Sequence, residues 1–205
     1  MTNWLRNLLT IAVLIVVAGC AVQVAESKRL KPIASKPEGV TFIWSASKAP
    51  SFSNLPALGV LMASYANMLS GANLKYFESY LAEHLSFGRS LQSTLPSEPL
   101  FRQTAKVITL PPGHSATQLQ DEIDRAQRGS AVVVLYPERV VSYCSPGCYA
   151  FKVRITYLAP INRSEVWSAL FDLPPKVKHG DSFDSVTGDF AKVLAEKMKA
   201  EQLLP

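Results

Sequence analysis

Residues 131–173 read AVVVLYPERVVSYCSPGCYAFKVRITYLAPINRSEVWSALFDL and contain three strand patterns in succession. The first, at residues 131–136, is rich in β-branched residues and continues past Pro137 to Tyr143, as is typical of a buried strand. After a turn, apolar and polar side chains alternate: Phe151, Val153, Ile155 and Tyr157 against Lys152, Arg154 and Thr156. Residues 166–173 alternate again, behind a second turn at residues 160–163. The stretch therefore predicts a meander of three antiparallel strands.

Two cysteines flank the first turn of this meander. Cys144 and Cys148 bracket Ser145, Pro146 and Gly147, an order that suits a type II turn. We expect a disulfide that closes the hairpin tip, since such bonds form in oxidising compartments. A redox pair and a metal site are the alternatives. A redox pair normally has Cys-x-x-Cys before a helix. A metal site needs ligands in addition to the two cysteines, and the histidines of this chain are isolated in the sequence.

Tyrosines stand next to both cysteines. Tyr143 and Tyr149 make the predicted tip aromatic, and rigid tyrosines lose little entropy when they bind a partner. The tip is therefore a candidate partner-binding element. The other interpretation is ordinary cross-strand pairing that stabilises the hairpin.

The rest of the chain mixes strand and helix patterns. Strands are expected at residues 40–44, 57–63 and 105–110. A helix is expected from Leu74 to Gly88, a second begins after Ser115 with Gln118 completing a capping box and stops at Gly129, and a third begins near Ser182. Residues 39–205 are thus predicted to form one α+β domain, with a mixed sheet ending in the meander and about three helices packed on it.

Composition limits the class of protein. The 205 residues are 48% hydrophobic and 18% charged, with a net charge of +5 and a mean hydropathy of +0.11. These values argue against disordered, collagen-like, coiled-coil and multi-span membrane chains. No stripe of lysine and arginine is present, so we expect no nucleic-acid partner.

The N-terminus has the parts of an export signal. Arg6 precedes an apolar run at residues 8–17, which is too short to span a bilayer comfortably. The run ends in Val17-Ala18-Gly19-Cys20, which resembles the lipobox of bacterial lipoproteins. The resemblance implies a signal peptide at residues 1–19, cleavage before Cys20, diacylglycerol on its thiol and an acylated amine. Several acyl chains give stable membrane anchoring.

The residues after the predicted anchor suggest in which membrane the protein is located. Residue 21 is Ala rather than Asp, and Asp at this position resembles an inner-membrane retention signal in lipoproteins of Gram-negative bacteria. The expected location is therefore the outer membrane, facing the periplasm. Residues 20–38 are polar and contain Pro32 and Pro37, which predicts a flexible tether between the lipid and the domain.

The second half of the chain also resembles a known layout. The order of helix, Gly129 turn, apolar strand, long hairpin, Val166-Trp167-Ser168 strand and final helix is similar to domains of penicillin-binding-protein activators and curli-secretion lipoproteins. The resemblance covers the chain from about Gln118 to Leu204 and carries no catalytic residue.

A search for catalytic motifs yields no candidate enzyme class. Nucleophile elbows, phosphate-binding loops and zinc-protease motifs are missing from the sequence. His114 beside Ser115 is the one tempting pair, but adjacent residues rarely aim at each other and Ser115 is the predicted N-cap. His84 is expected at the boundary between the buried and exposed faces of its helix, and His179 in a solvated loop. We therefore predict no catalytic residue, no metal and no cofactor.

Together these features favour a lipid-anchored accessory protein of the cell envelope. It would be non-enzymatic, tethered to the membrane by Cys20, and bound to a periplasmic or membrane protein. The alternative is a periplasmic carrier or sensor that binds a lipid, glycan or small molecule in a cleft lined by residues 57–69. An envelope hydrolase is a third possibility.

Overall fold

The computed structural model describes residues 21–33, 35–45, 71–102, 105–111, 113–126, 128–144, 148–174 and 182–205. Side chains at residues 71–81, 83, 138–144 and 148–151 are outside this description. The elements are β1 (Gln23–Arg29), β2 (Gly39–Trp44), α3 (Gly71–Ser97), β3 (Ala105–Thr109), α4 (Ala116–Arg125), β4 (Ser130–Cys144), β5 (Cys148–Leu158), β6 (Glu165–Asp172) and α5 (Asp184–Ala200).

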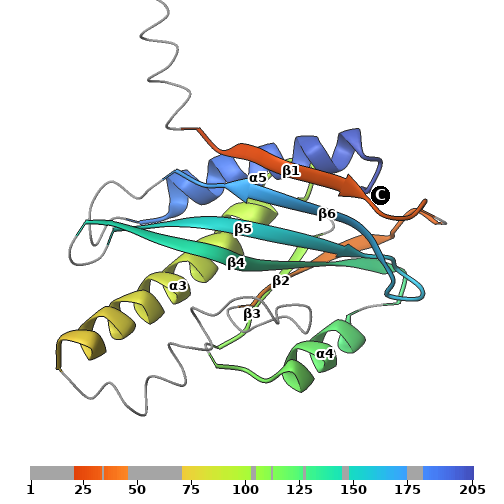
Figure 1. Ribbon diagram of the computed structural model, residues 1–205. Coiled ribbons are helices and arrows are strands. Elements are labelled where there is room, and N and C mark those ends of the chain that lie inside the picture. Colours follow the sequence, from red (N-terminus) through yellow and green to blue (C-terminus); the bar gives the residue numbers. More distant parts are fainter. Residues whose placement is uncertain are drawn as a thin grey trace, which may run out of the picture.

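The strands form one mixed sheet of six in the order β1-β6-β5-β4-β2-β3 (Figure 1). β2 is parallel to both β3 and β4, whereas β4, β5, β6 and β1 pair antiparallel in turn. The predicted α+β domain and its three-strand meander are confirmed. The predicted strand at residues 57–63 lies outside the described residues.

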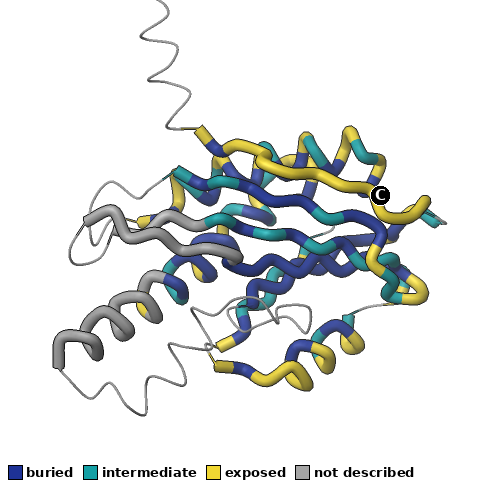
Figure 2. Tube along the Cα trace, in the orientation of Figure 1, coloured by how far each residue is buried: buried dark blue, intermediate teal, exposed yellow. Residues whose placement is uncertain are grey.

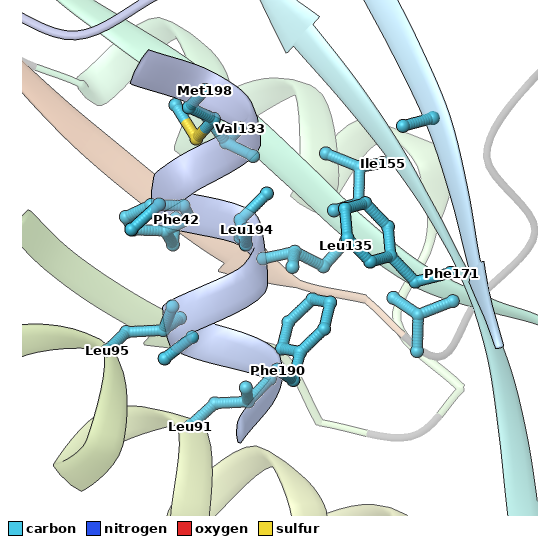
Figure 3. Packing of buried hydrophobic residues seen from close by; sticks show 14 of the residues in the cluster. Phe42, Leu91, Leu95, Val133, Leu135, Ile155, Phe171, Phe190, Leu194 and Met198 are labelled. Atoms are coloured by element: carbon cyan, nitrogen blue, oxygen red, sulfur yellow. The ribbon is translucent and has the colours of Figure 1, made fainter. Parts of the chain in front are cut away.

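Alternate residues of the sheet supply two cores. Phe42 and Trp44 of β2 lie in the large cluster, which includes side chains of α3 and α5, whereas Ile43 belongs to a smaller cluster with α4. In Figure 3 the α5 side chains Phe190 and Leu194 pack toward the sheet. Burying each such side chain contributes about 1.5–3 kcal/mol to folding. Figure 2 shows buried residues, in dark blue, along the central strands of the sheet, whereas β1 at its edge is exposed.

The predicted tether contains a strand, which corrects our expectation for residues 20–38. Gln23–Arg29 forms edge strand β1, which pairs with β6 from Gln23↔Asp172 to Arg29↔Trp167. Every side chain of β1 is exposed, so the sequence has no apolar alternation that could reveal it. Backbone pairing holds the strand, helped by the Trp167 indole, which donates to Ser27 Oγ at 3.1 Å. Val22, just before it, is buried in the large cluster.

Two glycines predicted to end helices have other roles. α3 continues through Gly88 to Ser97, and the missing side chain of Gly88 lets the helix approach β2 and β3 closely. An added Cβ there would lie 2.6 Å from Thr109 Cγ2. α4 ends at Arg125, and Gly129 instead forms the turn into β4 with a φ of 89°.

Candidate functional site

The two strands beside the predicted hairpin tip pair as far as the two cysteines. Cys144 lies opposite Cys148, and Ser142 opposite Tyr149, with an irregularity that contains Tyr143. The side chains of these residues and the turn at 145–147 are outside the described residues. The disulfide and the partner-binding role of Tyr143 and Tyr149 therefore stay predictions.

The outer part of this hairpin has no third strand beside it in the described part of the chain. β2 pairs with β4 only as far as Leu135, and β6 pairs with β5 only from Lys152 onward. Residues 140–144 and 148–151, which we name the hairpin arm, therefore form a two-stranded ribbon that runs past the sheet (Figure 1). A two-stranded ribbon is only marginally stable in water by itself, so a disulfide that closes its end would stabilise it.

A buried polar cluster lies at the carboxyl end of β2. Ser45 follows this strand between β3 and β4: its amide donates to Leu135 O at 2.9 Å, and the Leu110 amide donates to Trp44 O at 3.0 Å. The Ser45 hydroxyl is 2.8 Å from His114 Nε2. On the other side of the ring, His114 Nδ1 is 2.9 Å from Pro111 O.

These contacts fix the tautomer of His114. A carbonyl oxygen only accepts, so Nδ1 carries the proton and donates to Pro111, leaving Nε2 to accept from the Ser45 hydroxyl. Burial lowers the pKa of His114, which favours this neutral ring. The direction of the hydrogen bonds resembles that of a base and its nucleophile. However, Ser45 has 0% of its surface exposed, so the pair works here as a buried connection between β2 and the segment that enters α4.

The second histidine of the cluster corrects a prediction. His84, expected at the boundary between the buried and exposed faces of its helix, is 0% exposed and stacks on Trp44 with ring centroids 4.8 Å apart. Burial, with a smaller effect from nearby His114, lowers its pKa to about 3. The ring is therefore neutral over the physiological range and packs as an aromatic side chain. Trp44 and Trp167 are both core residues.

His114 and its neighbour Ser115 bond to different partners. Ser115 caps α4: its hydroxyl accepts from the Gln118 amide at 3.1 Å, and the Ser115 amide donates to Gln118 Oε1 at 2.7 Å. The predicted capping box is thus confirmed. Ser45, the actual partner of His114, carried no sequence signal because the two residues meet only when β2 and β3 pair.

The predicted anchor, the third histidine and the predicted cleft are not among the residues that the structure describes. Cys20, His179 and residues 57–69 lie outside the described residues. Among those that are described, no three His, Cys, Asp or Glu side chains come together as metal ligands. The same residues include no helix that is long and apolar enough to cross a membrane.

Comparison with known proteins yields distant likenesses. No protein-family profile matches the sequence, and no curated protein matches it. A structure of the PelC dodecamer from Paraburkholderia phytofirmans is similar with 13% identity and a TM-score of 0.41, covering 90% of this chain and 99% of that one. A single-substitution variant of the same PelC gives 15% identity and a TM-score of 0.37, with coverage of 83% and 95%. Likenesses this distant carry no argument about function.

Proposed function

We propose that the protein is a lipid-anchored accessory protein of the cell envelope that binds a periplasmic or membrane protein and catalyses no reaction. The observation that carries the proposal is Cys20 at the end of an export signal, within Val17-Ala18-Gly19-Cys20. Acylation there would hold the domain at a membrane, with the outer membrane favoured by Ala21.

The buried cluster supports the non-enzymatic part of the proposal. Ser45 and His114 form a pair with the hydrogen-bond direction of an activated hydroxyl, and 0% and 5% of their surfaces are exposed. A nucleophile must meet its substrate, so burial favours a structural role for this hydroxyl. Replacing Ser45 with Ala should then leave partner binding unchanged.

The test combines a chemical and a cellular measurement. Mass spectrometry of the protein purified from the membrane fraction should find diacylglycerol and an acyl chain on an N-terminal Cys20, and a Cys20→Ala variant should lack both. Crosslinking in cells followed by affinity purification should recover one envelope protein in near-stoichiometric amount, and less of it with Cys20→Ala. An unmodified Cys20 would refute the anchor. An acylated protein without a protein partner would refute the accessory role and favour the ligand-carrier alternative.

A further inference from the structure

The anchor and the hairpin arm belong to the same end of the sheet. Gln23 pairs with Asp172, Asp172 with Lys152, and Lys152 with Arg139, so these residues form a row across four strands. β1 and β5 are both antiparallel to β6, and therefore run in the same direction. The chain before Gln23, which leads back to Cys20, and the chain before Lys152, which is the hairpin arm, consequently leave the sheet at one end. Figure 1 shows the start of β1 and the far end of the β4–β5 hairpin on the same side.

The hairpin arm extends at least as far from this row of residues as the chain between Gln23 and Cys20 can extend. From Lys152 to Cys148 the strand advances about 14 Å at about 3.4 Å per residue. From Gln23 to Cys20 the chain spans at most about 11 Å, even when fully extended. Val22 is 8% exposed and part of the core, so Ala21 is the one residue between the fixed domain and Cys20. When the strands stand perpendicular to the membrane, acyl chains on Cys20 therefore bring the outer end of the arm, at Cys148, to the lipid surface.

The composition of the arm suits that surface. Residues 140–151 contain no charged residue, and the nearest charges are Arg139 and Lys152 at the base of the arm. Lys152 is paired with Asp172 at 2.8 Å. Tyr143 and Tyr149 are of the residue type that gathers at the boundary between lipid and water, where an apolar ring and a polar hydroxyl are both satisfied.

We propose that the hairpin arm rests in the interfacial layer of the membrane, as a second contact beside the acylated Cys20. The proposal rests on the proposed function, because it needs the anchor. The arm contacts a lipid surface rather than a protein. The short connection between β1 and Cys20 brings the outer end of the arm to the lipid, when the strands stand perpendicular to the membrane, whether or not a protein is present. Two contacts would fix the orientation of the domain, and the protein partner would then bind another face.

Depth-dependent quenching tests the proposal on the acylated full-length mature protein. Tyr149→Trp places a reporter in the arm, and Ile161→Trp places a matched reporter in the turn at the opposite end of the sheet, where Ile161 is 80% exposed. The native Trp44 and Trp167 are 0% exposed and give a constant background. Each protein is reconstituted in vesicles of phosphatidylcholine and phosphatidylglycerol, with and without bromine on the acyl chains.

The expected result is a loss of fluorescence in brominated vesicles for Tyr149→Trp only. The Ile161→Trp variant and the unsubstituted protein should keep theirs, and all three should float with the vesicles. Equal fluorescence for the Tyr149→Trp variant in both kinds of vesicle, with flotation intact, would overturn the arm proposal and leave the anchor standing; crosslinking of residue 149 to an envelope protein in cells would then identify a protein occupant. A mass spectrum without acyl chains on Cys20 would overturn the proposed function, and the arm proposal with it.

Discussion

Two helical glycines should respond to the same substitution with opposite signs. Gly88 lies inside α3 and Gly188 inside α5, and replacing a helical glycine with alanine ordinarily stabilises a protein by about 1 kcal/mol. A Cβ at Gly188 would meet no heavy atom within 4 Å beyond its chain neighbours and the nearby backbone of its own helix, so Gly188→Ala should raise the free energy of unfolding by about that amount. A Cβ at Gly88 would lie 2.6 Å from Thr109 Cγ2 and 2.8 Å from Trp44 Cδ1.

Neither neighbour of Gly88 can move away easily. Trp44 is 0% exposed and stacks on His84, while Thr109 is β-branched and donates its hydroxyl to Gly88 O at 3.2 Å. Forcing an extra methyl group into such packing costs about 1–3 kcal/mol, and two contacts place this case in the upper part of that range. After the gain in helix propensity, Gly88→Ala should lower the free energy of unfolding by about 1–2 kcal/mol.

Urea unfolding followed by tryptophan fluorescence measures both variants against the unsubstituted protein. The midpoints should move in opposite directions with an unchanged m-value. In thermal scans, about 1 kcal/mol corresponds to a change in Tm of about 2–4 °C for a domain of this size. A Gly88→Ala/Thr109→Ser double variant, which lacks the threonine methyl group, should recover part of the loss. If Gly88→Ala stabilised the protein as much as Gly188→Ala does, the close approach of α3 to β2 and β3 would be refuted.

Two further predictions concern buried titratable groups. The Tyr157 hydroxyl donates to Leu203 O at 3.1 Å, so Tyr157→Phe should cost about 1–2 kcal/mol in urea unfolding. Burial raises the pKa of Tyr157 to about 12. The stability that the neutral phenol contributes is therefore fully present below its ordinary pKa of 10.0 and is lost as the pH rises to about 12. A phenolate absorbance that titrates at 10.0 in the folded protein would contradict this. The pKa of His84 is lowered to about 3 from 6.5, so below pH 6.5 the unfolded chain binds a proton that the folded one does not. Between pH 7 and pH 4 the unsubstituted protein should therefore lose about 3 kcal/mol more stability than His84→Phe, at about 1.4 kcal/mol per pH unit below pH 6.5, and equal losses would contradict a buried neutral ring.

The features that the sequence predicted well are those set by local pattern. The alternation at Val153, Ile155 and Tyr157 identifies the inward face of β5, and all three are 0% exposed. Ser115 and Gln118 are three residues apart and cap α4 without help from the rest of the fold. Each of these signals is contained in a few consecutive residues.

The features that were missed depend on distant parts of the chain. Gly88 is indistinguishable from a helix terminator until Thr109 and Trp44 are placed beside it. His84 has the sequence context of a boundary residue, and it is buried because the end of β2 stacks against it. The bond between Ser45 and His114 requires the ends of β2 and β3 to meet, which no local spacing indicates.

The strand β1 changes what an anchor at Cys20 would do. A flexible tether would let the domain move freely above the membrane, but β1 is held by its ladder with β6 and by the Arg29 side chain, which contacts Glu201 at 3.2 Å after the end of α5. Exposed ion pairs contribute at most about 1 kcal/mol, so the ladder and the buried Val22 carry most of this attachment. A pull on the acyl chains would therefore load β1 and β6 directly. The N-terminus of the mature chain would then be part of the fold rather than a spacer, and the orientation of the domain would be set within a few residues of the lipid.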